Sequence, residues 1–184
     1  SGARRRGARA RSAPRRGKPV IHLRKLASHE SNLLRELRLR ALQESPGSFR
    51  DTYADAAAQP PSYWEDLARS TTEPGRNAMF LAYEEHELIG SAFALVDSVR
   101  SRTGRVGGMW VDPRWRRQGI GEALLQAVID WARERGFERL MLWCVASAVG
   151  PGALYRKAGF RETGYQQPLS DDSPLRVVEM ELQL

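Results

Sequence analysis

Residues 107–131 combine a strand pattern, a glycine-rich basic loop and a helix pattern, in that order. The strand is expected over residues 107–111, followed by a turn at 112–115 and the loop 116–121. Apolar residues then recur every three or four positions, which places them on one face of a helix that is expected to end at Gly136. These residues are Ile120, Leu124, Ala127, Val128 and Trp131. The sequence therefore predicts a strand that leads into a helix through a glycine-rich loop.

The start of this helix is expected to bind an anion. The first turn of a helix leaves backbone N–H groups without partners and carries the positive end of the helix dipole. Gly119 and Gly121, on either side of Ile120, have no side chains that would keep a ligand away from those groups. Further donors come from the side chains of Arg116, Arg117 and Gln118. A phosphate or pyrophosphate is the expected ligand.

Two common phosphate-binding loops do not fit this stretch. A P-loop requires Lys-Ser or Lys-Thr after its second glycine, and neither pair occurs in the chain. The dinucleotide-binding fingerprint requires a third glycine where this sequence has Leu124. The remaining pattern, Arg-x-x-Gly-x-Gly, fits an ordinary surface turn as well when it is taken alone.

Three pieces of the chain together resemble the GNAT family of acetyl-CoA-dependent N-acetyltransferases. They are residues 109–113, the loop 116–121, and residues 153–160, which resemble the family's Leu-Tyr-x-x-x-Gly-Phe element. The resemblance extends over residues 21–184 and is strongest over 109–164. It implies an α/β (α+β) fold, with a mixed, mostly antiparallel sheet, a splayed central strand pair and helices on both faces.

The resemblance implies acetyl-CoA as co-substrate and assigns residues to it. The strand Met109-Trp110-Val111 is expected to pair with the pantetheine arm through the backbone of Met109 and Val111, as an added peptide strand would. The pyrophosphate is expected on the loop Arg116-Arg117-Gln118-Gly119-Ile120-Gly121. The pair Gly107-Gly108 predicts a β-bulge or a close backbone approach in this strand, or else room for a large neighbour such as Trp110 or Trp143.

Acyl transfer to an amine requires a neutral amine, a donor for the oxyanion and a proton for the departing thiolate. By resemblance, an N–H near Val111 serves the oxyanion and Tyr155 is the catalytic proton donor. The alternative for Tyr155 is a buried aromatic with a satisfied hydroxyl. No metal is required, and the three histidines fit no metal motif.

The general base is not assigned. In relatives that acetylate the N-termini of ribosomal proteins, a glutamate stands where this chain has Trp143, which argues against that branch. An asparagine that contacts the cofactor in many relatives is replaced by Ala148. A water chain to Glu84, Glu85 or an acid of the early helices is one route for the proton. Cys144 is expected to be a small buried residue and not a nucleophile.

The early helices are expected over residues 28–44 and within 52–70, with Ser28 or Ser31 as one cap and Ser62 with Glu65 as a capping box. Strands are expected over 20–23, 79–83, 88–96, 139–145 and 177–182, with others entering from 105 and 160, and a short helix over 150–159. The loop 166–174 is expected to cover the acceptor. Acids and aromatics of the early helices are candidates to bind a cationic amine, although solvated helix faces explain most such acids: Asp51, Asp55, Glu65, Asp66, Tyr53, Tyr63 and Trp64.

The net charge of +7 is concentrated at the N-terminus. Residues 1–19 carry eight Arg or Lys and no acid, so residues 20–184 are nearly neutral and form the predicted single domain. The tail is expected to be flexible, as an extension or a vector-derived segment; a nucleic-acid arm and an organelle presequence are alternatives. We therefore do not expect nucleic acid as the main partner.

The single cysteine excludes an internal disulfide and fits a reducing compartment, and no apolar run reaches the roughly 18 residues of a membrane span. A cytoplasmic protein without a membrane partner is expected, and homodimerisation is left open. The expected function is N-acetylation of a primary amine of a small molecule, by direct attack in a ternary complex. The alternatives are a protein or peptide acetyltransferase and a non-catalytic acyl-CoA sensor.

Overall fold

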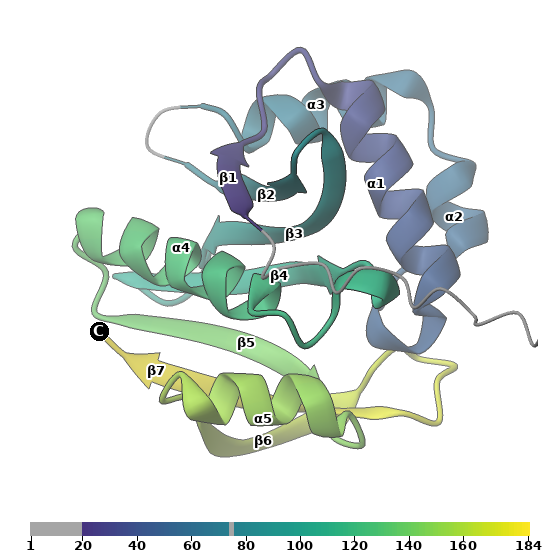
Figure 1. The fold of residues 1–184 in the computed structure, drawn as a ribbon. Helices are drawn as coiled ribbons and strands as arrows, with labels where there is room; N and C mark the ends of the chain where they lie inside the picture. The colour runs from purple at the N-terminus through teal and green to yellow at the C-terminus, as the bar shows by residue number, and fades with distance from the viewer. Residues whose placement is uncertain (1–19, 74–75) are drawn as a thin grey trace, which may run out of the picture.

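The computed structural model describes residues 20–73 and 76–184, so the predicted basic tail, residues 1–19, lies outside the described residues. Within them, seven strands form one sheet in the order β1-β2-β3-β4-β5-β7-β6 (Figure 1). The strands are β1 (Ile21–Lys25), β2 (Ala78–Glu84), β3 (Glu87–Val96), β4 (Thr103–Val111), β5 (Arg139–Val145), β6 (Arg161–Pro168) and β7 (Arg176–Gln183).

Helices cover both faces of this sheet, as predicted (Figure 1). One hydrophobic cluster packs α4 and α5 against the sheet, and a second packs α1 and α3 against its other face. None of the helices in the described part of the chain is long and apolar enough to cross a membrane. The helices are α1 (Ser31–Glu44), α2 (Tyr53–Ala57), α3 (Pro61–Ser70), α4 (Ile120–Glu134) and α5 (Val149–Lys157), with the 3-10 turns η1 (Pro46–Ser48) and η2 (Pro113–Trp115).

The sheet opens between β4 and β5. This is the parallel pair among the strands described, and it is hydrogen-bonded only where Thr103–Arg105 faces Arg139–Met141. Beyond that point the two strands diverge, while β5 stays paired with β7 along its whole length. The prediction of a mixed, mostly antiparallel sheet with a splayed central pair is confirmed.

A bulge in β4 lies at the start of the opening. The register of β4 against β3 shifts between Ser91 and Phe93, and Gly108 has a φ of +51°. A Cβ on Gly108 would lie 2.5 Å from the Phe93 ring, so this position needs glycine for both its backbone angle and its space. The glycine pair thus marks a bulge, as predicted, and the large neighbour is Phe93 and not Trp110 or Trp143.

The predicted caps of two early helices are wrong. Helix α1 begins at Ser31 after Glu30, with no side-chain cap, because the Glu30 carboxylate accepts hydrogen bonds from Arg24 and from the backbone N–H of Ala27. Helix α3 begins with Pro61 after Pro60, and the expected capping box does not form. Proline at the first helical position has no N–H to satisfy, which reduces the need for a cap.

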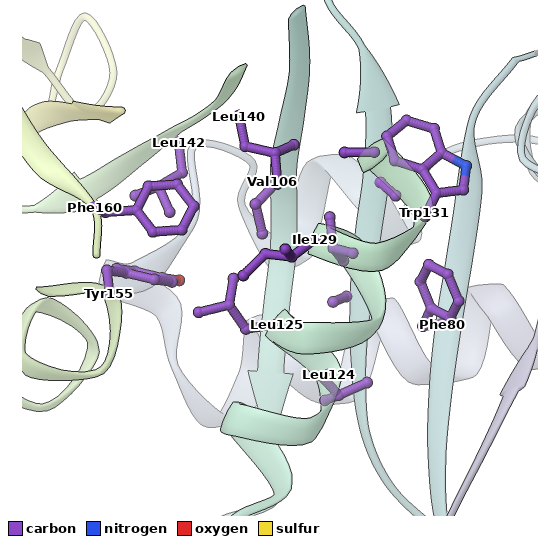
Figure 2. Packing of buried hydrophobic residues seen from close by; sticks show 14 of the residues in the cluster. Phe80, Val106, Leu124, Leu125, Ile129, Trp131, Leu140, Leu142, Tyr155 and Phe160 are labelled. Carbon is purple, nitrogen blue, oxygen red and sulfur yellow. The ribbon is translucent and has the colours of Figure 1, made fainter. Parts of the chain in front are cut away.

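Helix α4 is held in place by its apolar face. Leu124, Leu125 and Ile129 are almost fully buried against the sheet (Figure 2). Gly136, with a φ of +68°, ends the helix where the sequence predicts. The packing fixes the first turn of α4 at the open end of the β4–β5 gap.

Candidate functional site

A cavity of about 760 Å³ lies at the β4–β5 opening. Its lining includes Leu154 and Cys144 from the face covered by α4 and α5, and Trp143 and Phe49 from the opposite side of the sheet. The cavity therefore connects the two sides of the sheet through the gap. It is lined by Ser45, Ser48, Phe49, Met109, Trp110, Val111, Arg116, Arg117, Gly119, Gly121, Glu122, Trp143, Cys144, Val145, Ala148, Gly150, Pro151, Ala153, Leu154, Tyr155 and Lys157.

The backbone of β4 presents hydrogen-bonding groups to this gap. The N–H of Asp112 donates to the carbonyl of Ile89 at 2.9 Å. Hydrogen-bonded and non-bonded pairs alternate in an antiparallel ladder, so the N–H and C=O of Val111 point away from β3, into the opening. The side chain of Trp110 is buried in the cluster under α1 and α3, and by the same alternation its N–H and C=O face β3, so Trp110 presents neither group to a ligand in the gap.

The N-terminus of α4 lies at one end of the cavity. Gly119 precedes the helix with a φ of +87°, and no side chain among the described residues caps this end. Ile120 is buried, so it can offer a ligand only its backbone N–H. A Cβ on Gly121 would lie 3.2 Å from Leu154, so this glycine lets α5 approach the first turn of α4. The unpartnered amides expected from the sequence are therefore exposed to the cavity.

The three polar side chains of the loop have different surroundings. Arg116 donates from Nε to the carbonyl of Val111 at 2.9 Å and from Nη2 to Ser45 Oγ at 3.2 Å. Gln118 donates to the carbonyl of Arg114 at 3.3 Å, which holds the turn. Arg117 is exposed and lines the cavity. Arg116 thus ties β4 to the α1–α2 connection, and Arg117 is the arginine most open to an anion.

Asp112 fastens the start of this loop to α1. Asp112 is buried, with 3% of the residue exposed. Its carboxylate accepts hydrogen bonds from the N–H of Arg114 at 2.9 Å and from Arg114 Nε at 3.1 Å. Arg40 of α1 forms an ion pair with the same carboxylate and lies 5.0 Å from the centre of the Trp110 ring. The position of the loop is therefore coupled to the helix on the opposite side of the sheet.

We expect Asp112→Ala to lower the free energy of unfolding by about 2 kcal/mol, because the change removes a cap and two charged partners. Solvent screens part of the electrostatic attraction, because the side chains of Arg40 and Arg114 are 38% and 65% exposed, and this limits the expected loss of stability. Urea unfolding measures the change. Asp66→Ala is the control: it breaks the exposed pair with Arg69 and should cost less than about 0.5 kcal/mol. Equal losses for the two variants would contradict this role of Asp112.

Tyr155 of α5 lies at the cavity with its ring packed against Phe160. The residue is 7% exposed, and its ring meets that of Phe160 edge to face at 6.0 Å. Figure 2 shows the hydroxyl end directed toward the side of α4 that carries Leu125. Within the described residues the hydroxyl makes no hydrogen bond, in contrast to the alternative of a satisfied buried aromatic. Burial raises the pKa of the phenol well above its usual value, so Tyr155 keeps its proton at neutral pH.

Two residues near Tyr155 in the cavity lining, one on β5 and one just before α5, differ from the family pattern. Trp143 lines the cavity where the N-terminal acetylating branch has a carboxylate, and Ala148 precedes α5 without a polar side chain. Cys144 is buried, and desolvation raises the pKa of its thiol, which disfavours the thiolate. None of these three side chains can remove a proton from an amine.

The acids and aromatics proposed for the acceptor on the early helices do not line the cavity. Trp64 is buried in the core under α1, with Tyr63 packed edge to face against it. Asp51 forms an ion pair with Arg38 at 2.8 Å, and Asp66 forms one with Arg69. The structure therefore does not bring these residues to the cavity, and for Trp64 the reason is that the amphipathic α3 turns this aromatic into the core.

The site also contains residues that sequence reasoning missed. Ser45, Ser48 and Phe49 come from the α1–α2 connection, where a proline-containing 3-10 turn carries no recognisable motif. The Phe49 ring lies 4.7 Å from the Arg38 guanidinium, which fixes its orientation. Only the tertiary packing of α1 brings these residues to the gap.

Sequence comparisons agree with this geometry. The profile of the Acetyltransferase (GNAT) family matches residues 38–160, more than half of the chain. Human N-acetyltransferase 8 is 30% identical over 54% of this chain and 45% of its own length. Aminoglycoside N(6')-acetyltransferase type 1 of Stenotrophomonas maltophilia is 38% identical over 54% of this chain and 69% of its own length. A ribosomal protein bS18 alanine N-acetyltransferase of Escherichia coli K12 is 46% identical over 28% of this chain and 35% of its own length.

The chain thus spans less than half the length of the human relative. Solved structures extend the likeness to the whole domain: a GNAT-family acetyltransferase of Streptococcus pneumoniae superposes with a TM-score of 0.73 at 20% identity, over 90% of this chain and 100% of the other. At that identity the likeness concerns the fold. Together with the profile match, it shows that the chain belongs to the acetyltransferase (GNAT) family.

Proposed function

We propose that the protein is an N-acetyltransferase that moves an acetyl group from acetyl-CoA to a primary amine of a small molecule, by direct attack in a ternary complex. One observation carries the proposal: the cavity through the β4–β5 gap joins the N-terminus of α4 to Tyr155. An anion site and a proton donor therefore share one space. Family membership agrees with this reaction class.

The residues present fit acetyl-CoA. The unpartnered amides after Gly119 and the exposed Arg117 provide donors for a pyrophosphate. The backbone of Met109 and Val111 provides the strand edge for the pantetheine arm. Acetyl-CoA supplies the acyl group in activated form, as a thioester.

Two groups of the chain act on the reacting atoms in this proposal. The N–H of Val111, directed into the gap, donates to the acyl oxygen and stabilises the negative charge that develops there. Tyr155 gives its hydroxyl proton to the departing sulfur, a role that suits a phenol held protonated by burial.

A small acceptor is supported by a contact next to Ser48, which lines the cavity. The β6–β7 loop reaches η1, where a Cβ on Gly47 would lie 3.2 Å from Leu175 (Figure 1). This contact leaves less room for a folded protein. Trp143, in place of a carboxylate, further separates the chain from the N-terminal acetylating pattern.

A non-catalytic acyl-CoA sensor is the second candidate, because no unpaired carboxylate or imidazole lines the cavity within the described residues. Titration calorimetry with acetyl-CoA, followed by a thiol-release assay with a panel of small primary amines, separates the two. We expect binding and amine-dependent release of CoA. Binding without release from any amine would favour the sensor, and absence of binding would contradict both.

A further inference from the structure

The part of the cavity on the side of the sheet covered by α1 and α3, which we call the acceptor side, has apolar walls. Phe49, Trp143 and Val145 line it, and the Arg38 guanidinium lies 4.7 Å from the centre of the Phe49 ring. Two serine hydroxyls, of Ser45 and Ser48, are the polar groups that accompany them. These surroundings suit a ligand with an apolar group and a few hydrogen-bonding atoms.

The charged side chains of the lining are mostly at the other end, except that Arg116 reaches Ser45 on the acceptor side. Arg117 borders the N-terminus of α4, and Arg116 is bonded to Val111 and Ser45. Glu122, the acid among the lining residues of the described chain, forms an ion pair with Lys157 at 2.7 Å. No carboxylate therefore faces the acceptor side in the described part of the protein.

Acids close to the cavity but outside its lining are engaged elsewhere. Glu179 is paired with Trp143 across β5 and β7, but it is buried, bound to Arg100 at 2.9 Å and to Thr163 at 3.1 Å. Asp112 is bound to Arg40 and Arg114. Neither carboxylate is available to a ligand.

The remaining part of the chain offers no substitute. Residues 1–19, Pro74 and Gly75, which the structure does not describe, contain no Asp, Glu or His. Tyr155 and Cys144 both have a pKa raised by burial, so they hold their protons. Glu84, Glu85 and the acids of the early helices do not line the cavity, so no lining residue in the described part of the chain is available to take a proton from an ammonium ion.

Building on the proposed function, we propose that the acceptor is a small, weakly basic α-amino compound with an apolar side group, which enters with its nitrogen already neutral. The nitrogen forms a bond to the acyl carbon, and the C–S bond breaks. The sulfur takes the Tyr155 proton, and the nitrogen releases its surplus proton to water. Water also returns a proton to Tyr155, so the balance needs no other reactant.

The expected preference for an α-amino compound over an alkylamine follows from the fraction of each amine that is neutral. At pH 7.5 about a third of an α-amino group with a pKa near 7.7–8.0 is neutral, against about a thousandth of an alkylamine with a pKa near 10.4. The alkylamine is the stronger nucleophile once neutral, which offsets part of this difference. A net preference of about tenfold or more remains.

A matched pair of amines tests the proposal on the unmodified protein. Phenylalaninamide and phenethylamine share the ring and its distance from nitrogen, and differ in the carboxamide that lowers the basicity of the amine. At pH 7.5 we expect kcat/KM for CoA release to be about tenfold or more higher with phenylalaninamide. Glycinamide, which lacks the apolar group, should be at least about tenfold poorer than phenylalaninamide. Equal or better turnover of phenethylamine, or of the polycation spermidine, would overturn the proposal.

The pH dependence tests the missing base directly. With each amine, kcat/KM should rise with pH until that amine is neutral, so the break should lie at lower pH for phenylalaninamide. One shared break below pH 7 with both amines would reveal a base on the protein and overturn the proposal. Trp143→Glu should supply a base and narrow the gap between the amines, whereas the matched Trp143→Gln should not.

These results are distinguishable from failure of the proposed function. If no amine releases CoA while acetyl-CoA binds, the transferase activity itself is contradicted. If amines are acetylated but without the predicted order, the activity stands and the acceptor class is wrong.

Discussion

Gly119→Trp is expected to weaken acetyl-CoA binding at least about 100-fold in titration calorimetry. Gly119 has a φ of +87°, a left-handed conformation that costs an L-residue about 1–2 kcal/mol. The indole would also project beside the amides at the start of α4, where the pyrophosphate is proposed to bind. Loss of two charge-assisted hydrogen bonds, at about 1.5–3 kcal/mol each, accounts for an effect of this size.

Gly136→Trp is the matched control for this variant. Gly136 has a φ of +68° and, like Gly119, nothing within 4 Å of the place of its Cβ. It lies at the other end of α4, about 25 Å away along the helix axis. We expect this variant to lose stability but to bind acetyl-CoA normally. Unchanged affinity in Gly119→Trp, or equal loss in both variants, would rule out the proposed anion site.

Tyr155→Phe is expected to lower kcat about 100-fold or more and to leave the affinity for acetyl-CoA nearly unchanged. Positioned proton donors contribute about 100- to 10,000-fold to rates. The change keeps the ring that packs edge to face on Phe160. It also removes a hydroxyl that makes no hydrogen bond in the described residues, so no buried partner is left unsatisfied.

Three measurements separate chemistry from folding in this variant. Thermal unfolding should show a melting temperature close to that of the parent protein, and calorimetry should show the same Kd. Steady-state CoA release should show the loss in kcat alone. Full turnover by Tyr155→Phe would remove Tyr155 from the mechanism, and a loss of stability would assign it a packing role.

The parts of the fold that were predictable are those with a local signal. The apolar run of β5 and the periodic apolar face of α4 were both located correctly, because burial imposes a pattern on consecutive residues. The bulge at Gly108 was also readable, since glycine is unfavourable in a strand unless the backbone needs it. The loop predicted over 116–121 begins as expected after η2 but ends at Gly119, because α4 begins at Ile120.

The parts that were not predictable depend on contacts between distant residues. Glu30, before α1, accepts a hydrogen bond from Arg24 of β1, and neither Ser28 nor Ser31 caps the helix. Phe49 reaches the cavity only because α1 packs across the sheet, and nothing in its neighbourhood in the sequence indicates this. The hydrogen bond from Arg116 Nε to the carbonyl of Val111 is likewise a result of the folded geometry.

The opening between β4 and β5 also bears on self-association. A strand edge with unpaired main-chain groups normally offers a template on which other chains can add and aggregate. Here the two such edges belong to adjacent strands of one sheet and face each other across a lined cavity. A foreign strand would have to enter between them, past α4 and the η1–Leu175 contact. The unpaired main-chain groups of β4 and β5 therefore lie inside the sheet and do not form an exposed edge to which another chain could add.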